Sequence, residues 1–300
     1  MDYGRIETSG VWYRIQIALV FLAPVILLGG LYVLGKALPV PHLGRDYVIR
    51  FELPQSGTTV GLPEVLGPQD ASRPLVVIDA GHGGHDPGAS GPDYKEKTLV
   101  LGLARALRDR LLEDGGIRVA MTRDDDRYLV LAERAAIARA LGADLFLSIH
   151  ADSAGEKDEV SGASIYTLSD QASSEAAARF AARENQADEV NGVTLAGQSE
   201  TVSAILVELS QRRSSASSSA FADLIVREGE GRLKFHPQPM RSAALAVLRA
   251  PDVPSVLFES GFVTNREDAA RLASAKGRRD FADALDRAIR VYFARTRATG

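Results

Sequence analysis

The stretch "LVVIDAGHGGHDPGASGPDYKEKTLVLGLARAL", residues 75–107, decides the fold class of this chain. It begins with a run of aliphatic residues, continues through five glycines and two histidines, and then adopts the apolar spacing of a helix. This order predicts a buried strand, a tight turn and an amphipathic helix. Turns between a strand and a helix carry many of the binding sites of α/β proteins.

The same alternation continues along the chain. Aliphatic runs predict further strands, and helical spacing predicts the helices between them, with a last helix that runs from about Arg266 to the C-terminus. The expected further strands are residues 117–122, 144–149, 163–168 and 255–260. Strands that alternate with helices predict one α/β domain, which we place at residues 74–298.

The N-terminal part of the chain has a different composition. Residues 15–35 carry no charge and as a helix would extend ~31 Å, about the thickness of the hydrocarbon core of a bilayer. We therefore expect a short N-terminal segment at 1–14, a transmembrane anchor at 15–35 and a Pro- and Gly-rich linker at 36–73. A cleaved secretory signal is the alternative, and both interpretations predict export of the remainder.

Composition excludes several classes of protein. The chain is 45% hydrophobic and 25% charged, which fits a globular protein with a sizeable core. A net charge of −4 and the lack of any Lys/Arg cluster argue against nucleic acid as a partner. There are no cysteines, so a metal ion would have to be held by His, Asp or Glu.

Four polar residues occupy positions where α/β proteins place their chemistry. His82, His150 and Glu259 lie at or just after the ends of predicted strands, and Glu96 begins the first helix. Loops converge at the carboxyl ends of such strands, so these side chains are expected near one another. Two imidazoles and a carboxylate form a common catalytic zinc set, and a second carboxylate can take a proton from the attacking water.

Each of these residues also has a purely structural explanation. A histidine after a strand is often a hydrogen-bonded loop residue, and Glu96 can stabilise a helix N-terminus as an anion. The chain has no HExxH motif, so spacing alone does not establish a zinc site. It also lacks GxxxxGK[ST], which argues against a phosphate-binding loop. Glu259 is the stronger signal, because an unpaired acid at the end of an apolar strand is costly.

Other acidic and imidazole side chains near these positions are candidates for supporting roles. Asp79 or Asp152 could orient a metal ligand, or could accept hydrogen bonds from backbone amides. Asp86 is expected to shape the glycine-rich turn, and His85 is expected to be exposed. His236, in "LKFHPQP", is expected in a loop.

Several blocks of the sequence resemble a known family. The blocks "VVIDAGHGGHDPGASG", "KEKTLVLGLARAL", "VAMTRDDDRYLVLAERAAIARALGADLFLSIHAD" and "VLRAPDVPSVLFESGFVTN" resemble, in this order, zinc-dependent N-acetylmuramoyl-L-alanine amidases of the type-3 amidase family. The resemblance covers about residues 75–295. It implies a twisted mixed sheet flanked by helices, one Zn²⁺, and cleavage of the amide between the lactyl group of N-acetylmuramic acid and L-alanine in peptidoglycan.

The resemblance also implies roles for individual residues. Matched by motif, His82, Glu96 and His150 are the zinc ligands, and Glu259 is the catalytic carboxylate. Residues 170–213 resemble the insert of division-associated amidases, in which a helix covers the cleft and a carboxylate occupies the open position of the zinc.

Glu184 is the residue that we expect to be this inhibitory ligand, and the alternative is a solvated acid on an amphipathic helix. In the resembling enzymes a LytM-type activator protein binds the insert and releases the site. Many of them also carry a β-rich targeting domain, for which residues 36–73 are too few. We therefore expect the anchor to hold the catalytic domain at the inner membrane, in the periplasm.

The leading prediction is thus a membrane-anchored peptidoglycan amidase. A non-catalytic wall-binding or regulatory protein with the same fold is the first alternative, and the complete set of four site residues argues against it. A zinc peptidase of similar fold is the second, and product analysis on muropeptides separates it from an amidase.

Overall fold

The computed structural model describes residues 61–186 apart from Glu156 and Asp158, residues 204–299, and a few helical positions between Trp12 and Leu27. The chain divides into two units, Met1–Val60 and Gly61–Gly300. Most of the expected anchor and the linker as far as residue 60 lie outside the described residues. Within the described part of the chain, no helix has both the length and the apolar character needed to cross a membrane.

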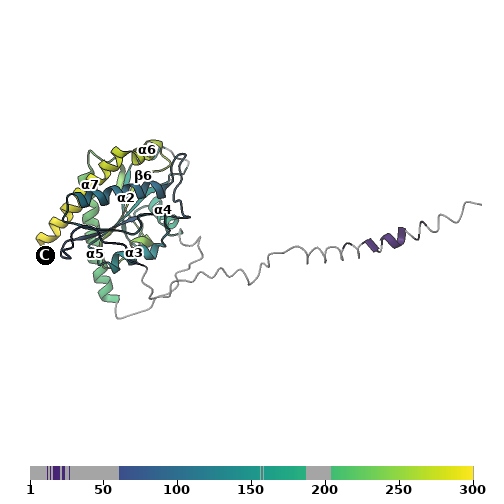
Figure 1. Ribbon diagram of the computed structural model, residues 1–300, viewed down its shortest axis with the longest axis horizontal. Coiled ribbons are helices and arrows are strands. Elements are labelled where there is room, and N and C mark those ends of the chain that lie inside the picture. The colour runs from purple at the N-terminus through teal and green to yellow at the C-terminus, as the bar shows by residue number, and fades with distance from the viewer. Residues whose placement is uncertain are drawn as a thin grey trace, which may run out of the picture. The chain divides into compact units, whose positions relative to one another are not determined.

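The second unit is a mixed sheet between two layers of helices (Figure 1). Its elements, in chain order, are β1 (Leu75–Ala80), α2 (Glu96–Glu113), β2 (Arg118–Met121), α3 (Leu131–Ala140), β3 (Leu145–Asp152), β4 (Ala163–Leu168), α4 (Glu175–Asn185), α5 (Ala204–Gly229), β5 (Phe235–Ala243), the 3₁₀ turn η2 (Ala246–Leu248), β6 (Ser255–Phe262), α6 (Arg266–Ala273) and α7 (Ala275–Thr299).

The six strands are ordered β2-β1-β3-β6-β4-β5. The first four are parallel, β4 is antiparallel to β6, and β5 is parallel to β4. This is the mixed α/β sheet that the sequence predicted. The carboxyl ends of β1, β3 and β6 therefore meet at one edge.

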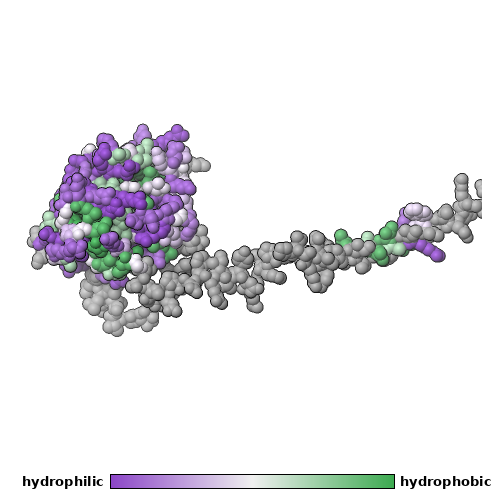
Figure 2. Space-filling model, in the orientation of Figure 1, coloured by the Kyte–Doolittle hydropathy of each residue, from purple (hydrophilic) through white to green (hydrophobic). Residues whose placement is uncertain are grey.

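The core has two layers because the central strands are buried on both faces. Val76 and Ile78 pack with α2, α5 and α7, whereas Leu75 and Val77 pack with α3, α4 and η2. Burial on both faces explains why β1 is apolar throughout instead of alternating. Each large aliphatic side chain buried in this way contributes roughly 1.5–3 kcal/mol. Hydrophilic side chains cover most of the face of this unit seen in Figure 2.

Two elements differ from the sequence predictions. His236 does not lie in a loop but near the start of β5, which also contains Pro237 and Pro239. Proline is tolerated there because β5 is an edge strand and needs fewer backbone donors. The last helix is not continuous but breaks at Ser274, whose backbone is extended and whose hydroxyl accepts a hydrogen bond from the Gly277 amide.

The compact unit also begins before Pro74, where we expected the linker to end. Leu66 and Val119 exchange backbone hydrogen bonds of 2.8 and 2.9 Å, so this segment pairs with the edge strand β2. Val65 packs against the core beside it. Residues 61–73 are therefore part of the domain.

Candidate metal centre

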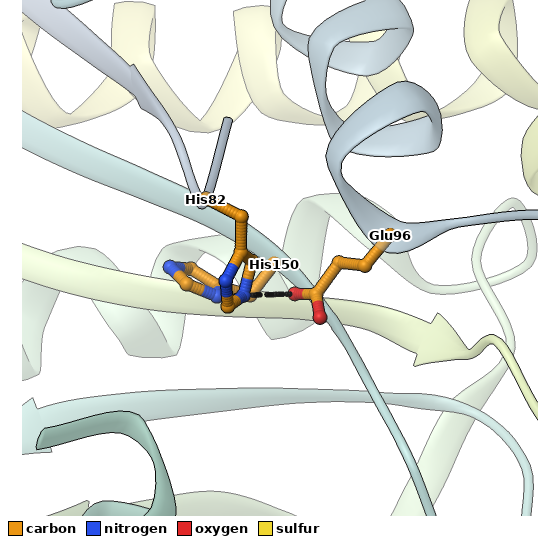
Figure 3. Close-up of side chains that lie close together, drawn as sticks. All are labelled: His82, Glu96 and His150. Carbon is orange, nitrogen blue, oxygen red and sulfur yellow. Dashed lines mark hydrogen bonds and ion pairs between the residues drawn. The ribbon is translucent and has the colours of Figure 1, made fainter. Parts of the chain in front are cut away.

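The residues of the candidate site come together at the carboxyl ends of the parallel strands. His82 follows β1, His150 lies near the end of β3, and Glu96 is the first residue of α2. Figure 3 shows both imidazoles converging on the Glu96 carboxylate. Glu259, in β6, is the direct register partner of His150. The structure therefore brings together all four residues that the sequence singled out.

The three proposed ligands form a compact, buried cluster. Glu96 Oε1 lies 3.1 Å from His82 Nε2 and 3.1 Å from His150 Nδ1, and one ligand atom of each residue lies within 4.8 Å of the others. Their exposed fractions are only 8%, 3% and 3% for His82, Glu96 and His150. A buried set of two nitrogens and one carboxylate could hold a metal ion.

Unsatisfied atoms support this assignment. Among the described residues, Nε2 of His150 is buried without a hydrogen-bond partner, and Nε2 of His82 is buried without a well-formed hydrogen bond although it lies 3.1 Å from Glu96 Oε1. Burial would lower the pKa of His82, but the negative charges of Glu96 and Asp86 raise it well above its usual value. The site therefore favours a positive charge, which a divalent cation supplies when the imidazoles are neutral.

The glycine-rich turn lets these side chains approach closely. A Cβ atom at Gly81 would lie 2.4 Å from Cε1 of His150, and one at Gly88 would lie 2.6 Å from Glu96 Oε2. His82 itself has φ of 59°, and no other non-glycine residue in the described ranges has a positive φ. This left-handed backbone costs free energy, so its surroundings must hold it in place.

Asp86 orients the first ligand, a role that the sequence analysis did not assign to it. Its Oδ2 atom lies 2.8 Å from His82 Nδ1, and its Oδ1 atom accepts a 3.0 Å hydrogen bond from the Gly88 amide. Asp86 thus shapes the turn, as expected, and also directs His82 Nε2 toward Glu96. The available signal was its position four residues after His82 within a tight turn.

Asp79, which was a candidate for that orienting role, has a different one. It accepts hydrogen bonds from Thr122 Oγ1, Ser148 Oγ and Arg134 Nη1, and bonds to neither histidine in the described part of the chain. Burial alone would raise its pKa, but Arg134 and the two hydroxyls lower it. Asp79 therefore anchors the sheet beneath the site as a carboxylate.

Glu259 is a buried carboxyl group without hydrogen bonds. Both of its Oε atoms lack a partner among the described residues, and only 2% of the residue is exposed. Burial, together with the negative charges of Asp152, Glu96 and Glu184, raises its pKa well above the usual value. A carboxyl group whose pKa is raised in this way stays protonated to a higher pH than an exposed one and is suited to proton exchange.

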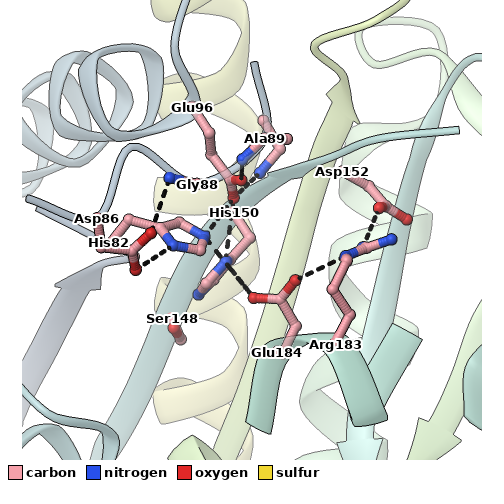
Figure 4. Close-up of polar contacts among 12 residues, drawn as sticks. His82, Asp86, Gly88, Ala89, Glu96, Ser148, His150, Asp152, Arg183 and Glu184 are labelled. Atoms are coloured by element: carbon pink, nitrogen blue, oxygen red, sulfur yellow. Dashed lines mark hydrogen bonds and ion pairs between the residues drawn. The ribbon is translucent and has the colours of Figure 1, made fainter. Parts of the chain in front are cut away.

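Glu184 reaches the metal-ligand cluster from α4 (Figure 4). Its Oε2 atom lies 3.5 Å from His150 Nδ1 and 3.7 Å from His82 Nε2. The side chain is 10% exposed, which does not fit the alternative of a solvated acid. The preceding residue, Arg183, donates a hydrogen bond to Asp152 Oδ1. Asp152 therefore holds α4 in place, whereas the sequence had made it a candidate to orient a histidine.

Two further contacts hold α4 over the sheet. The ring of Phe180 stacks on that of Tyr166 in β4, with 4.4 Å between centroids. The Asn185 amide donates to Ala244 O and accepts from the Ala246 amide, at 2.8 Å each. Both ring stacking and hydrogen bonds therefore hold the helix that carries Glu184 in place.

An α/β sheet with a buried His, Glu, His cluster and an adjacent protonatable carboxyl group is typical of metal-dependent hydrolases. Comparison with known proteins narrows this class. The family model Amidase_3, N-acetylmuramoyl-L-alanine amidase, matches residues 76–291. This chain belongs to that family of peptidoglycan amidases.

Individual relatives agree with the family match. AmiA of Escherichia coli K12 is 36% identical over 238 residues, which cover 79% of this chain and 82% of AmiA. AmiC of Escherichia coli O6:H1 is 36% identical over 240 residues, 77% of this chain but only 57% of AmiC. The structure of AmiC2 of Nostoc punctiforme matches with a TM-score of 0.55 at 28% identity, over 74% of this chain and 98% of AmiC2.

Proposed function

We propose that this chain is a zinc-dependent N-acetylmuramoyl-L-alanine amidase that cleaves the amide between the lactyl group of N-acetylmuramic acid and L-alanine. The observation that carries the proposal is the buried cluster of His82, Glu96 and His150 with Glu259 beside it in the sheet. When bound to this cluster, Zn²⁺ would supply Lewis acidity that polarises the scissile carbonyl and acidifies water.

The other steps belong to the side chains of the chain itself. Glu259 would accept a proton from the attacking water and return it to the leaving amine. Its burial and unpaired oxygens suit this exchange, because no hydrogen bond fixes one protonation state. Asp86 would keep the His82 ring aligned through the 2.8 Å contact with Nδ1.

The position of Glu184 supports an autoinhibited resting state. Its carboxylate approaches both histidines and would compete with water and substrate for the metal. An activator of LytM type that binds the insert at 170–213 would shift the population toward a form in which α4 has left the site. Residues 15–35 would hold the domain at the outer face of the inner membrane, in the periplasm.

The Glu259→Gln variant tests the catalytic assignment. Because Glu259 is not among the proposed ligands, the variant should bind as much zinc as the unchanged protein but cleave purified peptidoglycan ~10²–10⁴-fold more slowly. Zinc content by elemental analysis and release of stem peptide are the two measurements. Glu267→Gln, an exposed acid in α6, is the matched control. Cleavage at the unchanged rate would exclude Glu259 from the reaction.

A further inference from the structure

A second polar cluster lies on the edge strand β5, and its centre is Arg241. The Nε atom of Arg241 donates to Gln238 O at 3.3 Å, and Nη1 donates to the Tyr166 hydroxyl at 3.2 Å. Nη2 lies 3.1 Å from His236 Nδ1. The guanidinium carbon is 5.8 Å from the centre of the Tyr166 ring. These contacts hold a partly buried guanidinium in one place.

Every partner of this guanidinium is neutral. The Gln238 amide donates a 3.1 Å hydrogen bond to His236 Nδ1, so that nitrogen is an acceptor. Burial and the positive charge of Arg241 lower the pKa of His236, which keeps the imidazole uncharged. Burial raises the pKa of Tyr166 to about 12, so the phenol is protonated. No carboxylate of the described residues forms an ion pair with Arg241.

The positive charge of the guanidinium is therefore not neutralised, and part of its hydrogen-bonding capacity is unused. Arginine has five N–H groups. Nε donates to Gln238 O, Nη1 donates to the Tyr166 hydroxyl, and Nη2 lies 3.1 and 3.4 Å from the two ring nitrogens of His236, which leaves one N–H of Nη1 without a partner among the described residues. A guanidinium N–H of this kind can donate a charge-assisted hydrogen bond to a carboxylate oxygen. A partly buried cation with only neutral partners is costly, and an anionic ligand would remove that cost.

The cluster lies at the same end of the sheet as the metal centre. β4 separates β5 from β6, and because β5 is antiparallel to β6, the start of β5 lies at the same end of the sheet as Glu259. Arg241 contacts His236 and Gln238, so its side chain points back toward that start. The negative charge of Glu259 also acts on the Tyr166 hydroxyl, which bonds Arg241.

Register places the two groups on one face of the sheet. Arg241 pairs with Tyr166, and Tyr166 pairs with Leu257, two residues before Glu259. Residues two apart share a face, and two strand spacings are roughly 10 Å. An extended peptide covers roughly 3.5 Å per residue, so a carboxylate two or three residues beyond a scissile amide would reach this distance.

We propose that Arg241 binds a free carboxylate of the peptidoglycan stem peptide beyond L-alanine. The assignment rests on the proposed amidase function, because that function places a stem peptide at the metal centre. Arg241 is then a specificity residue that distinguishes stem peptides with a free acid from those in which the acid is amidated.

Binding measured without turnover tests this role. The parent is the full-length, zinc-loaded chain with Glu184→Ala, to clear the site, and Glu259→Gln, to stop cleavage. The probes are N-acetylmuramyl-L-alanyl-D-glutamate with its γ-carboxyl blocked as a methylamide, and the same compound with its α-carboxyl also amidated, titrated calorimetrically. We expect the parent to bind the acid about tenfold more tightly than the amide. Arg241→Gln should abolish that preference by lowering the affinity for the acid and leaving the affinity for the amide unchanged. Arg241→Lys should retain only part of the preference for the acid, since lysine carries the charge but lacks the planar guanidinium group.

Lys234→Gln is the matched control, because Lys234 precedes β5 and is half exposed. It should keep the preference for the acid. Three results would overturn the role of Arg241. The parent could bind acid and amide with equal affinity, it could bind neither, or Arg241→Gln could lower the affinity for both probes equally. Peptidoglycan cleavage by the Glu184→Ala chain is measured separately. If the chain cleaves peptidoglycan but shows no preference for the acid, only the role of Arg241 is contradicted. If it prefers the acid but does not cleave, only the amidase assignment is contradicted.

Discussion

His82 shows how much of the site is built around a single residue. Its backbone is left-handed, its ring nitrogen bonds Asp86, and its carbonyl accepts a 2.8 Å hydrogen bond from Arg134. Each contact fixes a different part of the residue, so Nε2 is held toward Glu96 before any metal arrives. A site organised in this way loses less entropy when it binds the metal.

The Asp86→Ala variant tests this organisation. Loss of the Nδ1 contact frees the imidazole ring, so the affinity for zinc should fall ~10–100-fold. Asp93→Ala changes an exposed acid in the same loop and should leave the affinity unchanged. Competition with a chelator of known affinity measures both. Equal affinities in the two variants would show that Asp86 does not support the metal site.

The sequence predicted which side chains would lie together better than it predicted the contacts that support them. His82, Glu96, His150 and Glu259 follow from their positions at strand ends and from the family motifs. The sequence analysis made Asp79 a candidate for the orienting role and gave Asp86 only the turn, although both lie within four residues of His82. Only the path of the turn decides that Asp86 folds back onto the ring while Asp79 faces Arg134.

At the scale of elements, α4 is the helix that covers the candidate site. Its contacts are few and polar on the site side, where Arg183 bonds Asp152 and Glu184 approaches the histidines. The opposite side of α4 packs in the core, where Phe180 stacks on Tyr166, so release of the helix must also break apolar contacts. A partner that displaced α4 would have to compensate for the loss of these contacts.

Glu184→Ala should raise basal hydrolysis in the absence of any activator. Removal of the carboxylate takes away the competitor for the metal, and we expect an increase of about tenfold or more if the closed form dominates. Glu175→Ala, in the exposed first turn of α4, is the control. Dye release from labelled peptidoglycan reports the rate. An unchanged or lower rate in Glu184→Ala would exclude the inhibitory role.

Elements with a strong apolar pattern were predicted well, whereas β5 and the break before α7 were not. The buried strands β1, β3 and β6 are nearly continuous apolar runs, which a sequence shows directly. β5 alternates weakly and contains two prolines, so its strand character depends on pairing with β4. The break at Ser274 was missed because a hydroxyl cap inside a helical pattern is a weak local signal.

At the scale of the whole molecule, two buried arginines join the sheet to the site loop. Arg134 in α3 bonds Asp79 in β1 and the carbonyls of Ala80 and His82. Arg123, after β2, bonds the carbonyls of Ala80 and Gly81. Both side chains are essentially inaccessible to solvent. The fold and the metal site therefore share the same polar network.

Arg134→Met should destabilise the domain strongly. It leaves the Asp79 carboxylate buried without its cation, which costs about 3–5 kcal/mol. Arg139→Met, on the same helix, removes an exposed ion pair with Asp252 and should cost about 0–1 kcal/mol. Urea unfolding at pH 7 measures both free energies. Similar losses in the two variants would contradict the central role of the buried network.

The amidase assignment itself is tested most directly by the products of cleavage. The purified full-length Glu184→Ala chain, loaded with zinc, is incubated with purified peptidoglycan, and the soluble products are identified by mass spectrometry. The account predicts intact stem peptides with a free amino group on L-alanine, together with glycan strands that keep the lactyl group. Fragments cut within the stem peptide, or no release from a zinc-loaded, folded chain, would contradict it.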